Sequence, residues 1–203
     1  MKFFPLKIKR EVLFVALLFV CTSFANAHSD LYADVKINAV FDEKGFVGVQ
    51  NIWSFDEVYS REMLAVADED GDGRFSLNES ELLKNEVLAP FMEADCFNHV
   101  LSGANFLRAK GIEKFSAKNK DGRLVLDFLV AYPVVPAISE YSMLVIAVWD
   151  PLHNILMTVD MDDSGVKNRT LDVEYFADKL DGLTLFRGFS ADAEGLFVRF
   201  KKK

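Results

Sequence analysis

Apolar and polar residues alternate along much of the chain, and this period of two predicts a protein built mainly of β-strands. Between residues 31 and 41 every second position is apolar, as in a strand with one buried face. A turn at 42–45 and the run 46–53 complete a hairpin. The same pattern predicts later strands at 112–118, 123–132, 141–149, 154–160, 173–176, 183–186 and 196–201, with an Asp121-Gly122 turn between the first two.

Between the first hairpin and the later strands, the apolar residues recur at helical spacing. Phe55, Tyr59, Met63 and Val66 predict a helix over 55–67. A second helix is expected at 79–88 and a third at 91–110, separated by Pro90. The predicted fold class is therefore α+β: a mainly antiparallel β-sheet or sandwich with an inserted helical segment at about 55–110.

The first residues have the features of a secretory signal peptide. A basic start is followed by a short apolar run at 12–20 and by Ala25-Asn26-Ala27, which carries small residues where signal peptidase reads them. We expect cleavage after Ala27 and a periplasmic mature protein, residues 28–203, that forms a single α+β domain. The alternative is a membrane anchor, which the shortness of the run disfavours.

Charge and cysteine content narrow the possible partners. Residues 1–27 hold four basic and one acidic residue, so their removal changes the net charge from −8 to about −11. Such a charge disfavours nucleic acid and anionic membrane surfaces as partners and favours cations. After signal cleavage we expect no stable membrane insertion.

Cys96 is the single cysteine of residues 28–203, which excludes an internal disulfide, and its apolar surroundings predict a buried, inert thiol.

Residues 68–79 match the calcium-binding loop of an EF-hand at every ligand position. Carboxylates stand at positions one, three, five and twelve, Gly73 at position six allows a sharp bend, and Phe75 at position eight is the apolar anchor. Four carboxylates suit a hard cation with oxygen ligands, and a bidentate glutamate favours Ca²⁺ over Mg²⁺. The predicted ligands are Asp68, Asp70, Asp72, the backbone carbonyl of Arg74, Ser76 through water, and Glu79. The alternative is an acidic surface loop without a metal, which the helical patterns on both sides of the loop disfavour.

Other candidate sites are weaker. Residues 160–165 begin like a second loop, but Leu171 stands where a ligand is needed, so a solvated turn is favoured. His28 could hold a transition metal with the new α-amino group, or lie in an irregular terminus. His99 is expected to be partly buried with its polar atoms satisfied, and His153 to lie at the surface. No spacing of Ser, His, Cys or Asp fits a catalytic motif, and we expect no enzyme activity.

The order of these features resembles a known family. The signal peptide, a histidine at the start of the mature chain, the hairpin, the segment Trp53-Ser54-Phe55-Asp56-Glu57-Val58-Tyr59-Ser60, the acidic loop and Asp150-Pro151 occur in this order. The chain resembles the domain-of-unknown-function family labelled as periplasmic component of an uncharacterised ABC-type transport system. Relatives tend to begin the mature chain with His-Pro-His, whereas His28-Ser29-Asp30 stands here.

The resemblance implies an accessory role in divalent-metal handling, with an inner-membrane metal transporter as a possible partner. The expected function is an exported calcium-binding protein that serves such a transport system. The alternative is a calcium-stabilised structural or protein-interaction module of the envelope, without a transport role.

Overall fold

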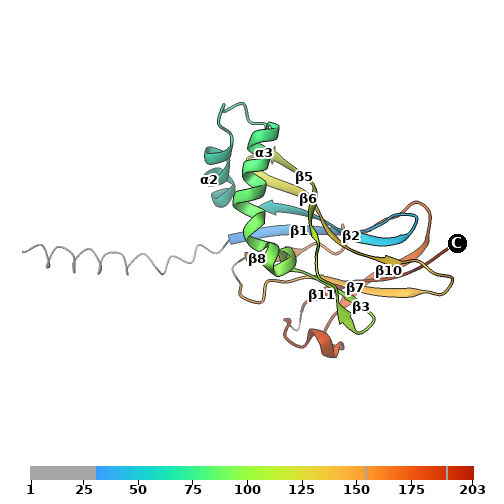
Figure 1. Ribbon diagram of the computed structural model, residues 1–203. Coiled ribbons are helices and arrows are strands. Elements are labelled where there is room, and N and C mark those ends of the chain that lie inside the picture. Colours follow the sequence, from blue (N-terminus) through green and yellow to red (C-terminus); the bar gives the residue numbers. More distant parts are fainter. Residues whose placement is uncertain (1–30, 154, 191) are drawn as a thin grey trace, which may run out of the picture. The chain divides into compact units, whose positions relative to one another are not determined.

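The computed structural model describes residues 31–153, 155–190 and 192–203, which belong to one compact unit, 31–203. The predicted signal peptide and His28 lie outside the described residues. Two β-sheets and one helical segment make up this unit (Figure 1). The chain is therefore mainly β, as its alternating pattern predicts.

Sheet A contains the first hairpin at its centre. Its strands are β1 (Leu31–Phe41), β2 (Gly45–Phe55), β5 (Gly111–Lys120), β6 (Arg123–Pro136), β8 (Ile155–Val159) and β9 (Gly165–Lys167). The order is β5-β6-β2-β1-β8, and β9 pairs with β1 beyond the end of β8. All pairs are antiparallel except those of β1 with β8 and β9, which are parallel.

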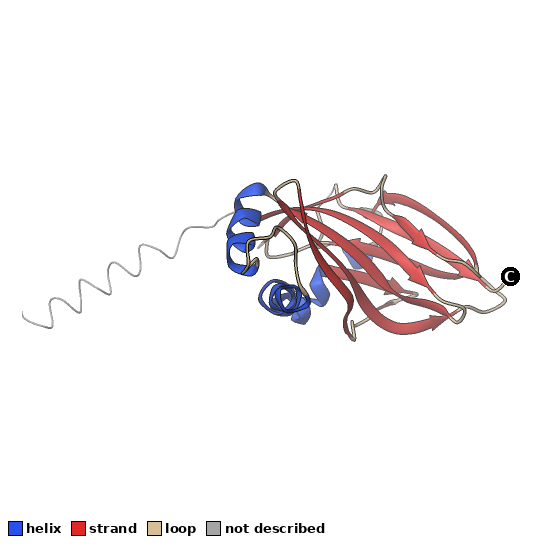
Figure 2. Ribbon diagram, turned by 90° about the horizontal axis from the view of Figure 1, so that it is seen from above, coloured by secondary structure: helices blue, strands red, loops and turns tan. Residues whose placement is uncertain are grey.

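Sheet B is antiparallel throughout, in the order β10-β11-β7-β3-β4. Its strands are β3 (Asn98–Ser102), β4 (Asn105–Phe106), β7 (Ser142–Val148), β10 (Asp172–Lys179) and β11 (Glu194–Lys201). The two sheets pack face to face and share one core (Figure 2). Because side chains alternate along each strand, Val35, Ile37 and Ala39 of β1 point into this core and are fully buried. The predicted sandwich is confirmed.

The helical segment follows the first hairpin, as predicted, and packs at one end of the sandwich (Figures 1 and 2). It consists of α2 (Glu57–Ala67), α3 (Leu77–Leu83), the π-helical turn η1 (Lys84–Leu88) and the 3₁₀ segment η2 (Ala89–Phe97). Phe55, Tyr59 and Met63 of the predicted apolar face lie in or against the core, as expected, but Val66 is 62% exposed. Ala67 is buried at this end of α2 instead. No helix among the described residues has the length and apolarity to cross a membrane.

The predicted third helix at 91–110 is wrong. The helical path continues through Pro90, which is tolerated because it stands in the first turn of η2. It then ends abruptly, because Asp95, Cys96 and Phe97 have positive φ angles of 51°, 48° and 58°. The Asn98 side chain stabilises this left-handed turn by donating to the carbonyls of Asp95 and Cys96. The chain continues as β3 and β4, so His99 lies on a strand.

One further predicted strand is also wrong. Residues 183–186 contain a short 3₁₀ helix, η3 (Thr184–Phe186), instead of a strand. Phe186 and Leu180 pack on the outer face of sheet B, against Leu101, Val145 and Ala147. Apolar residues in this stretch therefore cover a sheet instead of extending one.

Candidate metal centre

The helix that leads into the candidate loop is fixed firmly to sheet A. Asp56 is the N-cap of α2, and its carboxylate accepts hydrogen bonds from the backbone N–H groups of Val58 at 2.8 Å, Tyr59 at 3.0 Å and Tyr32 at 3.2 Å. One turn later, the buried Ser60 hydroxyl accepts a 2.8 Å hydrogen bond from the Leu124 N–H of β6. Therefore α2 reaches the loop from a rigid base.

The loop itself joins two helices, as an EF-hand requires. Helix α2 ends at Ala67, and α3 begins at Leu77. Ser76 and Glu79 form a capping box at the start of α3: Ser76 Oγ accepts from the Glu79 N–H at 3.3 Å, and Glu79 Oε2 accepts from the Ser76 N–H at 2.8 Å. Two predicted ligands thus also define where the second helix begins.

Three of the predicted carboxylates converge. Ligand atoms of Asp68, Asp70 and Glu79 all lie within 4.8 Å of one another. Calcium–oxygen distances of 2.3–2.6 Å allow two ligands of one ion to be up to about 4.6–5.2 Å apart. The spacing and the hard oxygen donors are therefore compatible with one calcium ion.

The backbone amides of the loop point toward the same carboxylates. Asp68 accepts from the N–H groups of Asp72 at 3.1 Å and Gly73 at 2.9 Å, and Glu79 Oε1 accepts from the Glu69 N–H at 2.8 Å. Gly73 has φ +76°, the left-handed conformation that position six of the loop demands. The hydrogen bonds from Ser76 and Glu69 hold the pKa of Glu79 below its usual value, so the carboxylate is charged at neutral pH.

Asp72, Arg74 and Ser76 differ from this group in their surroundings. The Asp72 carboxylate accepts the Arg74 N–H at 2.7 Å, and Asp72 is not part of the converging set. Ser76 caps α3, and both Arg74 and Asp72 are exposed. Phe75 packs against the main core and attaches the loop to the protein. Carboxylates from the start and the end of the loop therefore lie close together, whereas Asp72, in the middle of the loop, is exposed to solvent.

The second acidic stretch, 160–165, is a turn. Lys36 on β1 forms ion pairs with Asp163 and, at 3.8 Å, with Asp160. The Asp160 carboxylate also accepts the Asp163 N–H at 3.1 Å. The Lys36 ammonium thus pairs with two of the three carboxylates of this stretch, and Asp162 and Asp163 are exposed, consistent with the solvated turn that the sequence favours.

The remaining candidates behave as buried or surface groups. Cys96 is fully buried with a free thiol, and burial raises its pKa to about 12. His99 is partly buried, its Nε2 lies 2.9 Å from the carbonyl oxygen of Trp149, and burial lowers its pKa. His153 is exposed in a turn. Each of these agrees with the sequence interpretation, apart from the element on which His99 stands.

Sequence reasoning missed a polar pocket at the end of η2. His99, Asp95 and Arg108 line a cavity of about 270 Å³, and the Asp95 carboxylate lies 3.4 Å from the Arg108 guanidinium. The left-handed turn at 95–97 shapes this pocket. No glycine stands at these positions, so the sequence does not predict a left-handed turn there. The ion pair leaves Asp95 neutralised, and this pocket contributes no carboxylate to the converging set.

We expect Asp56→Ala to destabilise the protein by about 1 kcal/mol, the usual cost of losing an N-cap. Three backbone N–H groups lose their acceptor in this variant, whereas Asp56→Asn retains a capping oxygen and should recover most of the loss. Urea unfolding midpoints at neutral pH would measure both variants. Equal destabilisation by alanine and asparagine would show that the capping oxygen is unimportant.

The Asp56 carboxylate also predicts that the stability of the protein depends on pH. Burial alone would raise the pKa of Asp56, but the N–H groups of Tyr59, Tyr32 and Val58 outweigh burial and hold the pKa below its usual value. The stabilisation is therefore complete above the ordinary value near pH 3.9 and is lost as the pH falls through the lower folded-state value. Urea unfolding at pH values from about 5 down to 2.5 would measure this. The free energy of unfolding should fall more steeply for the wild type than for Asp56→Asn.

Comparison with known protein families identifies the chain at the family level. The sequence model described as Protein of unknown function (DUF1007) matches residues 13–175, which is most of the chain. The chain therefore belongs to this family. No curated protein matches it.

Proposed function

We propose that this member of the DUF1007 family is an exported protein that binds one calcium ion in the loop 68–79. The observation that carries the proposal is the convergence of Asp68, Asp70 and Glu79 between α2 and α3. The spacing of Asp72, Gly73, Arg74 and Ser76 along the same loop supports it, since it follows the EF-hand ligand order. The proposed role is binding rather than catalysis.

In this proposal, calcium rigidifies the helical segment. A bound divalent cation would neutralise the mutual repulsion of the loop carboxylates and tie the end of α2 to the start of α3. Because α2 is anchored to sheet A through Asp56 and Ser60, a fixed loop also fixes α3 relative to the sandwich. The single hand favours an affinity in the range of extracellular modules, roughly 10⁻⁴ to 10⁻³ M.

We place this calcium-binding protein in the periplasm, as an accessory component of a divalent-metal transport system. The basic and apolar leader of residues 1–27 supports export, and the resemblance to a transport-linked family supports the partner. Such a role requires a second site, for a transition metal, separate from the loop 68–79.

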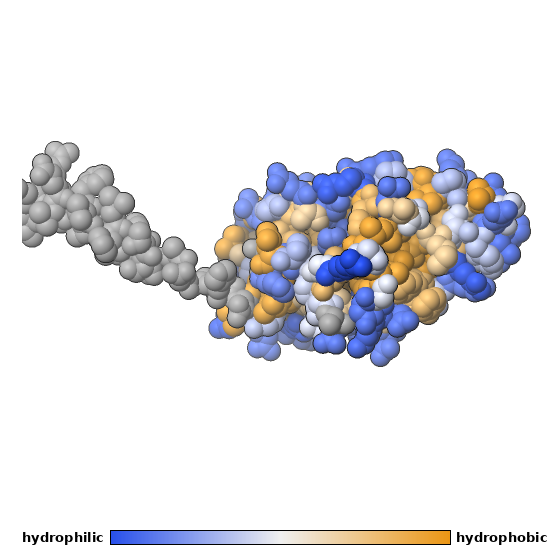
Figure 3. Space-filling model, turned by 90° about the horizontal axis from the view of Figure 1, so that it is seen from below, coloured by the Kyte–Doolittle hydropathy of each residue, from blue (hydrophilic) through white to orange (hydrophobic). Residues whose placement is uncertain are grey.

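A structural or protein-interaction role is the second candidate, and the outer face of sheet B favours it. Hydrophobic side chains gather on the face shown in Figure 3. On the outer face of sheet B, Met143 of β7 and Phe176 of β10 are more than half exposed, and Phe176 stacks on Phe197 of the neighbouring strand with ring centroids 5.1 Å apart. Exposed apolar surface of this kind is typical of an interaction surface.

Calorimetric titration of metal-free residues 28–203 with Ca²⁺, Mg²⁺, Zn²⁺ and Ni²⁺ would separate these proposals. We expect one Ca²⁺ site that Glu79→Ala abolishes. A separate Zn²⁺ or Ni²⁺ site that survives Glu79→Ala would support the transport role. A Ca²⁺ site without any Zn²⁺ or Ni²⁺ binding would overturn the transport role and favour the structural one, and absence of Ca²⁺ binding would overturn both.

A further inference from the structure

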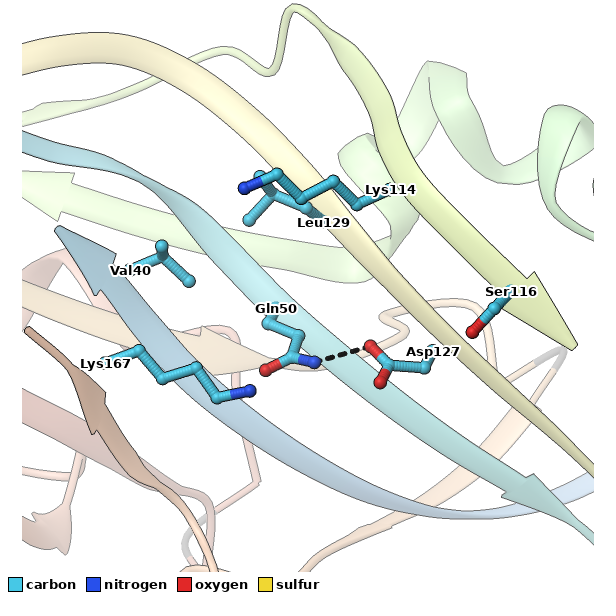
Figure 4. A pocket seen from close by; sticks show the side chains of 7 residues that line it. All are labelled: Val40, Gln50, Lys114, Ser116, Asp127, Leu129 and Lys167. Carbon is cyan, nitrogen blue, oxygen red and sulfur yellow. Dashed lines mark hydrogen bonds between the residues drawn. The ribbon is translucent and has the colours of Figure 1, made fainter. Parts of the chain in front are cut away.

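The outer face of sheet A carries a small polar pocket, far in sequence from the calcium loop. Its volume is about 220 Å³. The side chains that line it are shown in Figure 4. Its lining comes from five strands, β9, β1, β2, β6 and β5, and consists of Val40, Gln50, Lys114, Ser116, Asp127, Leu129 and Lys167. Five strands that are separate in sequence thus contribute to one hollow.

Strand register explains why these residues meet. Gln50 is opposite Leu129 on β6, and Asp127 is opposite Ser116 on β5. Gly48 lies in the neighbouring row, between Val40 and Ala131. A Cβ atom at Gly48 would lie 2.6 Å from the Val130 carbonyl oxygen and 2.9 Å from Leu129 Cδ1. The absence of a side chain there lets Leu129, only 5% exposed, form an apolar floor.

An irregularity in β5 brings the side chain of Lys114 into the lining of this pocket. The pairing of β5 with β6 shifts between Glu113 and Ser116, as in a β-bulge. Lys114 stands within this shift and has φ +50°, a strained conformation for a residue with a side chain. Its side chain lines the pocket together with Leu129 (Figure 4). Bulges that redirect side chains in this way are frequent at binding sites.

The pocket combines two lysine side chains with one carboxylate in its lining. Lys114 and Lys167 form no ion pair within the described part of the chain, whereas Lys36 and Arg123 of the same sheet are both paired. Gln50 Nε2 donates to Asp127 Oδ1 at 2.5 Å, and Gln50 Oε1 accepts from Asn38 at 3.4 Å. Asp127 is thereby held in place, and its second oxygen makes no hydrogen bond among the described residues.

The charges determine which ligand fits. Two ammonium groups favour carboxylates, but Asp127 repels a ligand that carries only negative charge. A ligand with two carboxylates and one ammonium group complements all three side chains. The volume lies below the 300–1,000 Å³ of pockets for drug-sized molecules, so the ligand is small.

We propose that this pocket binds a free acidic amino acid. Its carboxylates pair with Lys114 and Lys167, its ammonium group pairs with Asp127, and Ser116 is within the same lining as a further hydrogen-bonding group. A larger hollow of about 920 Å³ adjoins the pocket through Val40, Lys114 and Lys167. Its lining adds the cations Lys44 and Arg169 and the carboxylates Asp42 and Glu43, so four cations face two carboxylates there. These cations give the approach a positive character in an otherwise acidic protein. The site does not depend on the proposed calcium function.

Titration of residues 28–203 with L-glutamate and L-aspartate would test this site, with glutarate and succinate as matched ligands that lack the amine. We expect saturable binding of the amino acids. The dissociation constants of the dicarboxylates should be higher than those of the amino acids by a factor of roughly ten or more. Lys167→Gln and Lys114→Asn, the latter chosen because asparagine tolerates positive φ, should each weaken amino-acid binding about tenfold or more. Lys118→Gln, an equal charge change on an exposed lysine of β5 outside the pocket, should leave it unchanged.

Asp127→Asn is the decisive variant. It should weaken amino-acid binding but leave dicarboxylate binding equal or stronger, because it removes both the ammonium partner and the repulsion. The proposal would be overturned by absence of amino-acid binding, by dicarboxylates that bind as tightly as the amino acids to the wild type, or by an equal effect of Lys118→Gln.

Discussion

Glu79→Gln should remove the stabilisation that calcium gives to the wild-type protein. A ligand that binds only the folded state raises the free energy of unfolding by about 2.7 kcal/mol when its concentration is one hundred times its dissociation constant. In the proposed calcium site Glu79 would supply both oxygens of the last loop position, and its side chain is buried at the start of α3. Loss of its charge removes the bidentate ligand while changing the side-chain volume little. Thermal unfolding with and without Ca²⁺ would measure the effect.

Glu81→Gln is a matched control for this variant. Glu81 lies on the same helix, but its partner is Lys84, with a Glu81 Oε1 to Lys84 Nζ distance of 3.5 Å, outside the loop. The control should retain the full calcium response. In the absence of calcium, Glu79→Gln should also be somewhat less stable than the wild type, because the capping box with Ser76 is weakened. A calcium response that Glu79→Gln retains would contradict the assignment of the ligands.

Trp53→Ala should produce the largest loss of stability, about 3–5 kcal/mol, typical of a large aromatic residue removed from a core. Trp53 is fully buried on β2 and contacts four aromatic rings. Phe55 and Phe128 belong to sheet A, with ring centroids 6.1 Å and 5.1 Å away, whereas Phe91 and Phe97, at 6.4 Å and 6.3 Å, belong to η2. This side chain therefore joins the helical segment to the sheet.

Urea unfolding would measure the change, with Trp53→Phe expected to lose less than Trp53→Ala. The control is Ile52→Ala, the neighbouring position on the outer face of the same strand, which is only partly buried. A loss below about 1 kcal/mol for Trp53→Ala would show that the core collapses around the missing ring or that the helices pack elsewhere.

The long strands were predictable because a sandwich buries one face of each strand, whereas the short strands β3, β4 and β9 were not predicted. The alternation in 31–41 gives the whole of β1, and Asp121-Gly122, with φ angles of 54° and 83°, gives the turn between β5 and β6. The third helix was not predictable, because its end depends on a left-handed turn at Asp95–Phe97. The adjacent Asn98 stabilises that turn, and its side-chain oxygen accepts a 3.1 Å hydrogen bond from Asn51 on β2, which is distant in sequence.

The candidate sites also differ in how far the sequence alone predicts them. The loop 68–79 is local, so its ligand spacing can be recognised in the sequence before any fold is known. The pocket around Asp127 and the cavity beside Asp95 are assembled from separate strands, and their residues have no informative spacing. Predicting such sites requires the strand order and register, which alternation alone does not give.

A calcium titration of metal-free residues 28–203, followed through the backbone amide resonances, tests the central claim most directly. The account predicts saturable shifts that fit one site, concentrated at residues 68–79 and strongest near Gly73, whose N–H donates to Asp68 at 2.9 Å. Mg²⁺ should compete only weakly, because a bidentate glutamate site favours the larger ion. Absence of saturable shifts in this loop, or shifts centred elsewhere on the sandwich, would contradict the account.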